Sequence, residues 1–220
     1  MKKMKKILIV LAHLDDLEFG AIYLSSKLNK PNNIIHLIIC SSGLSSKSEN
    51  FNKERRIVQM VNASKIFNKV SNLKIIINHE YIDTTFPENR VQVRKFIEDN
   101  SKENYCTLIS HVPDIHCDHT IVSELVDIIA RPNIFNLRKS KFKKYIKIVI
   151  PSNEYLKNYG IGKNINISNH KIIKLTKDYK KYKLNLLKRY SFMFKNSFSS
   201  LKIIDIPEEY YTVYNLKGIR

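Results

Sequence analysis

The sequence has no long apolar run, which excludes an ordinary membrane-spanning helix. The first apolar stretch, residues 7–12, is six residues long, whereas a membrane span needs about 18 and the core of a signal peptide about 7–15. It follows a basic start, MKKMKK, but it runs into charged residues instead of a small-residue cleavage site. We therefore expect a buried strand here and a soluble, cytoplasmic protein.

Cysteines, repeats and linkers are also scarce. The three cysteines, Cys40, Cys106 and Cys117, are odd in number and far apart, which suits a reducing compartment better than a disulfide framework. No internal repeat or low-complexity linker divides the chain, and 43% of its 220 residues are hydrophobic. A chain of this length and composition can bury one sizeable core, so we expect a single domain over residues 1–220.

Acidic residues are few, 20 against 38 Lys and Arg, and the formal net charge is +18. This excess has two interpretations, a binder of nucleic acid or another polyanion or a merely lysine-rich composition. Lys far outnumbers Arg, and Asn and Ile are abundant, as an AT-rich genome would encode. Proteins that read base sequence rely on Arg. We favour the compositional interpretation and do not expect nucleic acid as a partner.

Short apolar runs alternate with longer segments of helical periodicity. The runs are rich in β-branched residues and almost continuously hydrophobic, which is typical of parallel strands covered on both faces. The alternation predicts an α/β fold, a single Rossmann-like, doubly wound, mainly parallel sheet with a 3-2-1-4-5 core, helices on both faces and right-handed crossovers. The expected strands are residues 7–12, 34–40, 73–77, 105–110 and 145–150, and the expected helices are residues 19–28, 49–67, 87–100 and 120–130.

The pattern weakens after residue 150. Residues 151–168 look like a loop and a short strand. Apolar residues then recur at three- and four-residue steps beside a Lys-rich face, which predicts an amphipathic helix. They are Leu175, Tyr179, Tyr182, Leu186 and Tyr190. We expect this C-terminal part, about residues 151–220, to pack on the core.

Two dense groups of polar residues stand where apolar strands end, in LIVLAHLDDLEFG (residues 8–20) and in HVPDIHCDHT (residues 111–120). Sites in doubly wound sheets form beyond the carboxyl ends of the strands, at the switch point of the strand order. Strands one and four are neighbours there, so the two groups should face each other across one crevice. Two histidines and one carboxylate with open positions form a metal site of the catalytic type. The facing residues are His13, Asp15 and Asp16 on one side and His116, Asp118 and His119 on the other.

These groups resemble the signatures of a known family. AHLDDLEFG is similar to AHPDDxEFG, and PDIHCDH is similar to xDxHxDH. Both belong to the LmbE/PIG-L family of zinc-dependent N-deacetylases. RIVQMVNASKIFN resembles the family's RxxExxxAAxxLG helix, and NINISNHKIIK resembles a late yvDIs…K segment. The resemblance covers roughly residues 5–190 and implies the family's activity and cofactor for this chain.

The resemblance implies a metal centre and a base. His13, Asp16 and His119 match the metal ligands, with Zn²⁺ as the default ion and other divalent ions as alternatives. Asp15 matches the general base. The chemistry agrees, because Zn²⁺ polarises an amide carbonyl and lowers the pKa of bound water to about 7. A carboxylate next to a ligand in sequence could reach that water's proton.

The resemblance also implies three residues that act on the substrate. His116 matches the residue that supports the tetrahedral intermediate, and Asp118 matches the acid that orients this histidine. Donors of this kind contribute about 3–4 kcal/mol when well placed. Arg56 falls where the family has a substrate-site arginine. Two departures are Leu14 in place of a turn-shaping proline and Gln59 in place of a glutamate.

Three classes of function remain. We favour a metal-dependent hydrolase that removes an N-acetyl group from an amino sugar, either plain or linked to phosphate, nucleotide or lipid. A non-haem Fe(II) enzyme uses the same type of ligand triad, but that triad occurs mainly on β-barrel scaffolds. A non-enzymatic polyanion binder would rest on the net charge of +18 alone. The sugar, the acyl group and the oligomeric state stay open.

Overall fold

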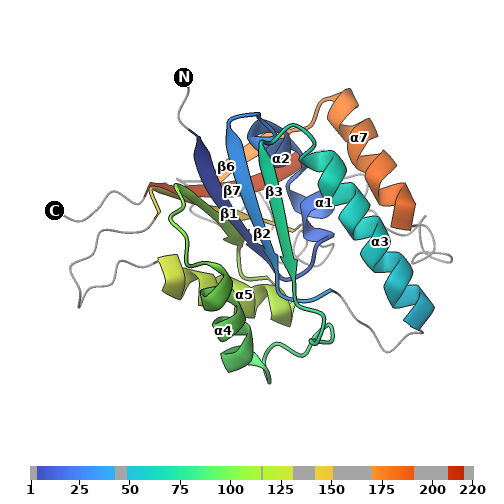
Figure 1. The fold of residues 1–220 in the computed structure, drawn as a ribbon. Helices are drawn as coiled ribbons and strands as arrows, with labels where there is room; N and C mark the ends of the chain where they lie inside the picture. The colour runs from blue at the N-terminus through green and yellow to red at the C-terminus, as the bar shows by residue number, and fades with distance from the viewer. Residues whose placement is uncertain are drawn as a thin grey trace, which may run out of the picture.

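The fold is built on a seven-stranded sheet, shown in Figure 1. The computed structural model describes residues 4–42, 49–114, 116–130, 142–150, 170–190 and 208–215. The strand order is β3-β2-β1-β4-β5-β7-β6. The strands are β1 (Lys5–Leu11), β2 (Asn33–Ile39), β3 (Asn72–Ile77), β4 (Thr107–His111), β5 (Lys144–Ile148), β6 (His170–Lys174) and β7 (Glu208–Asn215).

Strands β1 to β5 form the parallel core of the sheet. β1 lies between β2 and β4, with Ile9 opposite Leu37 on one side and Ile109 on the other. β3 joins β2, and β5 joins β4, again in parallel. The predicted α/β class and 3-2-1-4-5 core are therefore confirmed. β7 and β6 extend the sheet beyond β5 by antiparallel pairing, an extension that we did not predict from the sequence.

Helices cover both faces of the sheet (Figure 1). On β1, Ile9 and Leu11 belong to one hydrophobic core, and Leu8 and Val10 belong to the other. This double coverage explains why the strand is an unbroken apolar run. Among the described residues, none of the helices combines the length and hydrophobicity that crossing a membrane requires. One face carries α1 (Asp16–Gly20), α2 (Ile22–Leu28), α3 (Glu49–Ile66) and α7 (Lys177–Leu187), and the other carries α4 (Arg90–Asn100) and α5 (Cys117–Ala130).

The helix predicted over residues 19–28 is divided in two, so that prediction is wrong. Ala21, with φ −143°, separates α1 from α2. Gly20 ends α1 against the chain that follows β5, where an added Cβ would lie 2.6 Å from the carbonyl oxygen of Val149. The backbones can approach this closely only because glycine has no side chain. This contact fixes α1, and with it the acidic residues of the first polar group.

Two other helices begin away from the expected positions. α5 begins at Cys117 instead of residue 120, so Asp118 and His119 lie in its first turn. α4 begins at Arg90, after a turn that contains Pro87. The predicted C-terminal helix corresponds to α7 and a short 3₁₀ helix, η2 (Lys188–Tyr190). The loop and strand expected over residues 151–168 lie outside the described residues.

Candidate metal centre

The two polar groups meet at one edge of the sheet, beyond the carboxyl ends of the neighbouring strands β1 and β4. Nε2 of His13 lies 3.3 Å from Oδ2 of Asp118. Nε2 of His119 lies 3.3 Å from Oδ1 of Asp16. The ring of His116 stacks on that of His119, with centroids 4.6 Å apart. The structure thus brings the groups together, as the strand order predicts.

His13, Asp16 and His119 form a candidate metal-binding group, called the first group below. One ligand atom from each lies within 4.8 Å of the others, and all three side chains are buried. The backbone N–H of His13 donates to Oδ2 of Asp16 over 2.9 Å. Asp114 contacts Nδ1 of His119 at 2.7 Å, while Nε2 of that ring faces Asp16. A carboxylate on the far nitrogen commonly orients a metal-ligating histidine.

The facing residues of the two polar groups, together with Asp83, Asp114 and Arg55, form a cluster whose formal charge is opposite in sign to that of the whole protein. Five carboxylates and one guanidinium gather here, so the formal charge with neutral imidazoles is five negative charges against one positive, or −4. A concentration of negative charge in a buried site attracts cations strongly. The charged residues are Asp15, Asp16, Asp83, Asp114, Asp118 and Arg55.

The same charges shift the pKa values of the buried groups. Burial would raise the pKa of Asp16, but His119 and His111 lower it well below its usual range. Burial would lower the pKa of His119, but the charge of Asp16 and the contact with Asp114 raise it to about 9. The site therefore favours positive charge at its centre, whether protons or a metal ion supply it.

The arginine that contacts the acidic residues of the site is Arg55, the neighbour of the Arg56 that the sequence indicated. Arg55 is buried on α3, and its guanidinium lies 3.0 Å from Oδ2 of Asp15 and 3.7 Å from Oδ2 of Asp83. Arg56 is half-buried, and among the described residues no ion pair joins it to the cluster. The buried face of α3 carries Arg55 and Gln59, and a step of one residue turns a side chain about 100° around the helix.

Asp118 does not hold His116 as the sequence suggested. Its carboxylate contacts His13 and accepts a hydrogen bond of 2.8 Å from the backbone N–H of Thr84. His116 lies instead beside Asp83, with 3.4 Å between Nε2 of the ring and Oδ1 of the carboxylate. From Asp118 it accepts a hydrogen bond on Nδ1, and the donor is the backbone N–H. Sequence reasoning missed Asp83. Its place after β3, at the same edge of the sheet, is the signal that could have found it.

His111, the last residue of β4, is fully buried beneath the cluster. The backbone N–H of Ala12 donates to its Nε2 over 2.9 Å. Its ring stacks on that of His119, with centroids 4.5 Å apart and planes 8° from parallel. Burial lowers the pKa of His111. The ring of His111 supports that of His119 from below.

Glu18 supports the site from the other side, and it has no exposed surface. Its Oε1 accepts hydrogen bonds from Nδ2 of Asn62 (2.8 Å) and from the hydroxyl of Tyr190 (2.9 Å). Burial, and next the charge of Asp15, raise the pKa of Glu18 to about 8. Glu18 is therefore mostly protonated at neutral pH and joins α1, α3 and η2 without adding charge beside Asp15.

Glu18→Gln should change how stability depends on pH. The folded pKa is about 8 and the ordinary value 4.5, so the stability that the bound proton contributes is complete below about pH 4.5 and is lost as the pH rises through about 8. Glutamine does not ionise, so the variant should gain up to several kcal/mol in free energy of unfolding relative to wild type between about pH 5 and pH 8. Urea unfolding at each pH measures this difference. A constant difference would contradict the burial argument.

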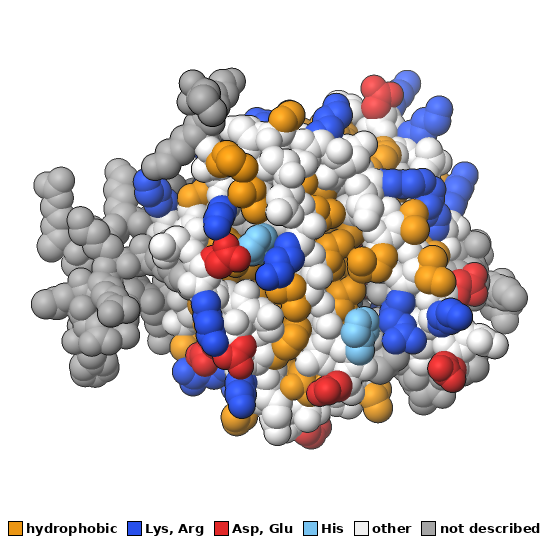
Figure 2. Space-filling model, viewed as in Figure 1, with side chains coloured by type: hydrophobic (Ala, Val, Ile, Leu, Met, Phe, Trp, Pro, Cys, Tyr) orange, Lys and Arg blue, Asp and Glu red, His pale blue; other side chains and the backbone are white. Residues whose placement is uncertain are grey.

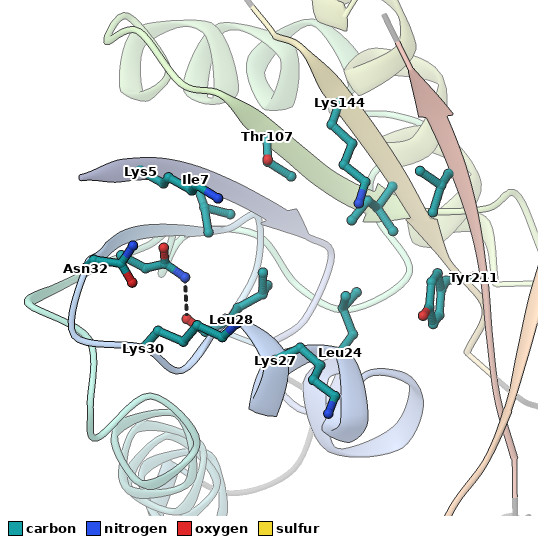
Figure 3. A pocket seen from close by; sticks show the side chains of 13 residues that line it. Lys5, Ile7, Leu24, Lys27, Leu28, Lys30, Asn32, Thr107, Lys144 and Tyr211 are labelled. Carbon is teal, nitrogen blue, oxygen red and sulfur yellow. Dashed lines mark hydrogen bonds between the residues drawn. The ribbon is translucent and has the colours of Figure 1, made fainter. Parts of the chain in front are cut away.

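A separate pocket lies at the opposite edge of the sheet, where β1, β4 and β5 begin (Figure 3). Its volume is about 530 Å³, and the described residues that line it include no histidine and no acidic residue. A metal ion would need ligands of that kind. The lining includes the four basic residues Lys5, Lys27, Lys30 and Lys144.

Basic side chains are spread over the face of the molecule that Figure 2 shows. On the face shown in Figure 2, Lys and Arg side chains stand apart and are interspersed with acidic ones. A nucleic-acid-binding face instead gathers its positive charge into a patch or stripe. The distribution on this face favours the compositional interpretation of the net charge of +18.

Fold and site define a class, an α/β protein with a candidate catalytic metal centre beyond the carboxyl ends of its parallel strands. A family model described as PIG-L, GlcNAc-PI de-N-acetylase, matches residues 8–130, which include both polar groups. The chain belongs to this PIG-L family, as its signatures indicate. No curated protein is significantly similar to it in sequence.

Several solved structures share the fold. N,N'-diacetylchitobiose deacetylase from Pyrococcus horikoshii is 17% identical with a TM-score of 0.58, covering 97% of this chain and 85% of that chain. The zinc-inhibited form of teicoplanin deacetylase Orf2 is 9% identical with a TM-score of 0.59, covering 96% and 98%. GalB, the 4-carboxy-2-hydroxymuconate hydratase from Pseudomonas putida, is 13% identical with a TM-score of 0.54, covering 99% and 98%. Because one of these proteins is a hydratase, the fold alone does not define the reaction.

Proposed function

We propose that this protein is a metal-dependent hydrolase that removes an N-acetyl group from an amino sugar or its conjugate. The observation that carries the proposal is the buried first group, His13, Asp16 and His119, with Asp15 next to it in the chain. Membership of the PIG-L family and the likeness to deacetylases support the same reaction.

The donor atoms of the first group fit a divalent ion, with Zn²⁺ as the default. Two imidazoles and one carboxylate leave a coordination position for water or substrate, as in catalytic zinc sites. The formal charge of −4 around them favours a cation. When bound, such an ion would polarise the amide carbonyl and lower the pKa of water to about 7.

Asp15 is the proposed general base. It precedes α1 directly, is only 7% exposed, and accepts a hydrogen bond of 3.0 Å from Arg55 on Oδ2. That bond orients the carboxylate, whose other oxygen can take a proton from the attacking water. The same group can then return the proton to the leaving amine.

His116 is the proposed donor to the substrate carbonyl oxygen. Its side chain is 33% exposed, whereas those of His13 and His119 are at most 7% exposed, so it is the one that an entering substrate can reach. Asp83, 3.4 Å from its Nε2, can compensate a positive charge on the ring. We propose for Asp83 the part that the sequence gave to Asp118. A well-placed donor of this kind contributes about 3–4 kcal/mol.

The proposed substrate carries phosphate or is linked to a nucleotide or lipid. A net charge of +18 creates a field that raises the encounter rate with anions. The immediate site is acidic, and Arg55 already contacts two carboxylates. The anionic part of the substrate would therefore lie outside the cluster, and the field would act on substrate capture more than on the chemical step.

Acetate release from UDP-N-acetylglucosamine, N-acetylglucosamine phosphate and plain N-acetylglucosamine tests substrate class. We expect kcat/KM for the two anionic substrates to fall several-fold from low to high salt, because salt screens the field beyond about 8–10 Å. The kcat values of these two substrates, and both kcat and kcat/KM for plain N-acetylglucosamine, should change little with salt. Equal rates on all three, insensitive to salt, would remove the anionic part of the proposal. Release from an acylated peptide but from no amino sugar would remove the sugar as well.

The two rival functions are not favoured. A non-haem Fe(II) enzyme would use the same ligands, but the scaffold is a mainly parallel α/β sheet and several neighbours are deacetylases. A polyanion binder would not require the buried first group. Oxygen-dependent turnover would reveal the former. A salt-dependent shift with random DNA that Asp15→Asn leaves unchanged would reveal the latter.

A further inference from the structure

A second group of metal-type ligands adjoins the first. It consists of His13, Asp83, His116 and Asp118, whose ligand atoms all lie within 4.8 Å of one another. His13 belongs to both groups, because its Nδ1 lies 4.0 Å from Oδ2 of Asp16 while its Nε2 faces Asp83 and Asp118. The two groups therefore meet different nitrogens of one imidazole ring.

The spacing in the second group is that of ligands around a small cation. Zn–N bonds of about 2.0–2.1 Å and Zn–O bonds of about 2.0–2.2 Å place tetrahedral ligands about 3.3–3.5 Å apart. Nε2 of His13 lies 3.2 Å from Oδ1 of Asp83 and 3.3 Å from Oδ2 of Asp118. Nε2 of His116 lies 3.4 Å from Oδ1 of Asp83. Charge-assisted hydrogen bonds between such groups are shorter, about 2.7–2.9 Å.

The Oδ1 atom of Asp83 is an independent indication. It is buried, and its contacts with Nε2 of His13 (3.2 Å) and Nε2 of His116 (3.4 Å) lack good hydrogen-bond geometry. A buried carboxylate oxygen without a hydrogen bond is unfavourable. A cation held jointly by this oxygen and the two nitrogens would satisfy all three atoms.

The loop after β3 fixes the two carboxylates of the second group relative to each other. The backbone N–H of Thr84 donates to Oδ2 of Asp118 over 2.8 Å, and that of Phe86 donates to Oδ1 over 3.1 Å. Thr84 has φ 72°, a left-handed conformation that residues other than glycine adopt infrequently. The loop is thus anchored on Asp118, with Asp83 immediately before the anchoring residue.

We propose that His13, Asp83, His116 and Asp118 form a second divalent-cation site, suited to Zn²⁺, whose occupation inhibits the enzyme. Two imidazoles and two carboxylates complete a tetrahedral shell and leave no position for substrate. An ion held there engages His116, so the proposed donor to the substrate oxygen is withdrawn. A neutral imidazole has a lone pair on only one nitrogen, so when both groups are occupied the ring of His13 releases its N–H proton to solvent and bridges the two ions as an imidazolate. The inhibition rests on the proposed function, whereas the binding of the ion does not.

Metal binding to the chelator-treated protein tests the site without any assay of activity. Equilibrium dialysis against Zn²⁺ or Co²⁺ should give about two ions per chain for wild type, about one for Asp83→Asn and about two for Glu80→Gln, the matched control in the same loop. Loss of the Asp83 ligand should weaken the second ion by about 100-fold or more. The visible spectrum of bound Co²⁺ should show a second tetrahedral component that Asp83→Asn removes. Mg²⁺ should not compete, because it requires octahedral oxygen ligands.

The possible failures are distinguishable. Wild type that saturates at about one Co²⁺ per chain, with a spectrum unchanged by Asp83→Asn, would overturn the second site and leave the proposed function standing. In another outcome, wild type binds a single ion, which Asp83→Asn loses and Asp16→Ala keeps. This result would support the second site and overturn the proposed function. Excess Zn²⁺ should inhibit acetate release by wild type at least about 10-fold more than by Asp83→Asn, each relative to its own rate. Equal inhibition of the two would overturn the inhibitory role.

Discussion

Asp15→Asn should lower kcat for acetate release by about 100- to 10,000-fold, the usual contribution of a general base, and leave the metal content unchanged. Asparagine keeps the shape of the side chain, and its oxygen can still accept the hydrogen bond that Arg55 donates to Oδ2 over 3.0 Å. It cannot take a proton from water. Rates at saturating substrate, measured beside elemental analysis of the same sample, check both parts.

The matched control for this change is Asp99→Asn on α4, where the carboxylate is 50% exposed and contacts Lys102. The chemical change is the same, but it lies outside the site, so rate and metal content should both stay at the wild-type level. An Asp15→Asn protein that loses its ion, or that works at nearly the full rate, would show that Asp15 is not the base.

Asp16→Ala or His119→Ala should lower the metal content by about one ion per chain and reduce acetate release to the level of chelator-treated protein. Each residue contributes one of only three ligands in the first group, and removal of a ligand acts on the ion directly. Elemental analysis of protein purified without chelator gives the metal content. The thermal unfolding temperature of each variant should be measured on the same sample, because Asp16 is buried beside His111 and His119 and its loss can also change stability.

Asp114→Asn provides a graded form of the same test. Asp114 contacts Nδ1 of His119 at 2.7 Å and does not belong to the first group. Loss of such an orienting partner typically weakens metal binding by about 10- to 100-fold, so the ion should be retained at high Zn²⁺ and lost at low Zn²⁺. Full metal content in Asp16→Ala together with an empty site in Asp15→Asn would reverse the roles assigned to the two aspartates.

The position of the site was predictable because strand order and polar clusters are both visible in the sequence. The strand over residues 7–12 ends in AHLDD, and the fourth strand ends in HVPDIHCDH. Parallel pairing of β1 and β4 then brings these ends together at one edge of the sheet. The parallel core needs no information beyond apolar runs and their alternation with helices.

The contact of Arg55 with the site was missed because α3 has an unusual distribution of side chains. Its buried face carries Asn52, Arg55 and Gln59, whereas Ile57 is 54% exposed and Met60 is 38% exposed. Hydrophobic periodicity orients a helix correctly only when its apolar side is the buried side. Here the polar side faces the site, so the choice between neighbouring arginines required the structure.

Asp83 and the two antiparallel strands, β6 and β7, were missed for different reasons. Asp83 stands alone in YIDTTFPE, and its contacts with His13, His116 and Arg55 join residues far apart in the chain. β7, by contrast, lies in EEYYTVYN, whose aromatic and β-branched residues have high strand propensity. That local signal was present, but its pairing with β5 depends on a long-range return of the chain.

Metal content and acetate release, measured together on wild type, Asp15→Asn and Asp16→Ala purified without chelator, test the central claim most directly. The account predicts a metal-loaded and active wild type, an Asp15→Asn protein with the same metal content and little activity, and an Asp16→Ala protein with about one ion fewer and no activity. Wild-type protein that contains no metal, binds no added Zn²⁺ at neutral pH and still releases acetate at its full rate would contradict it.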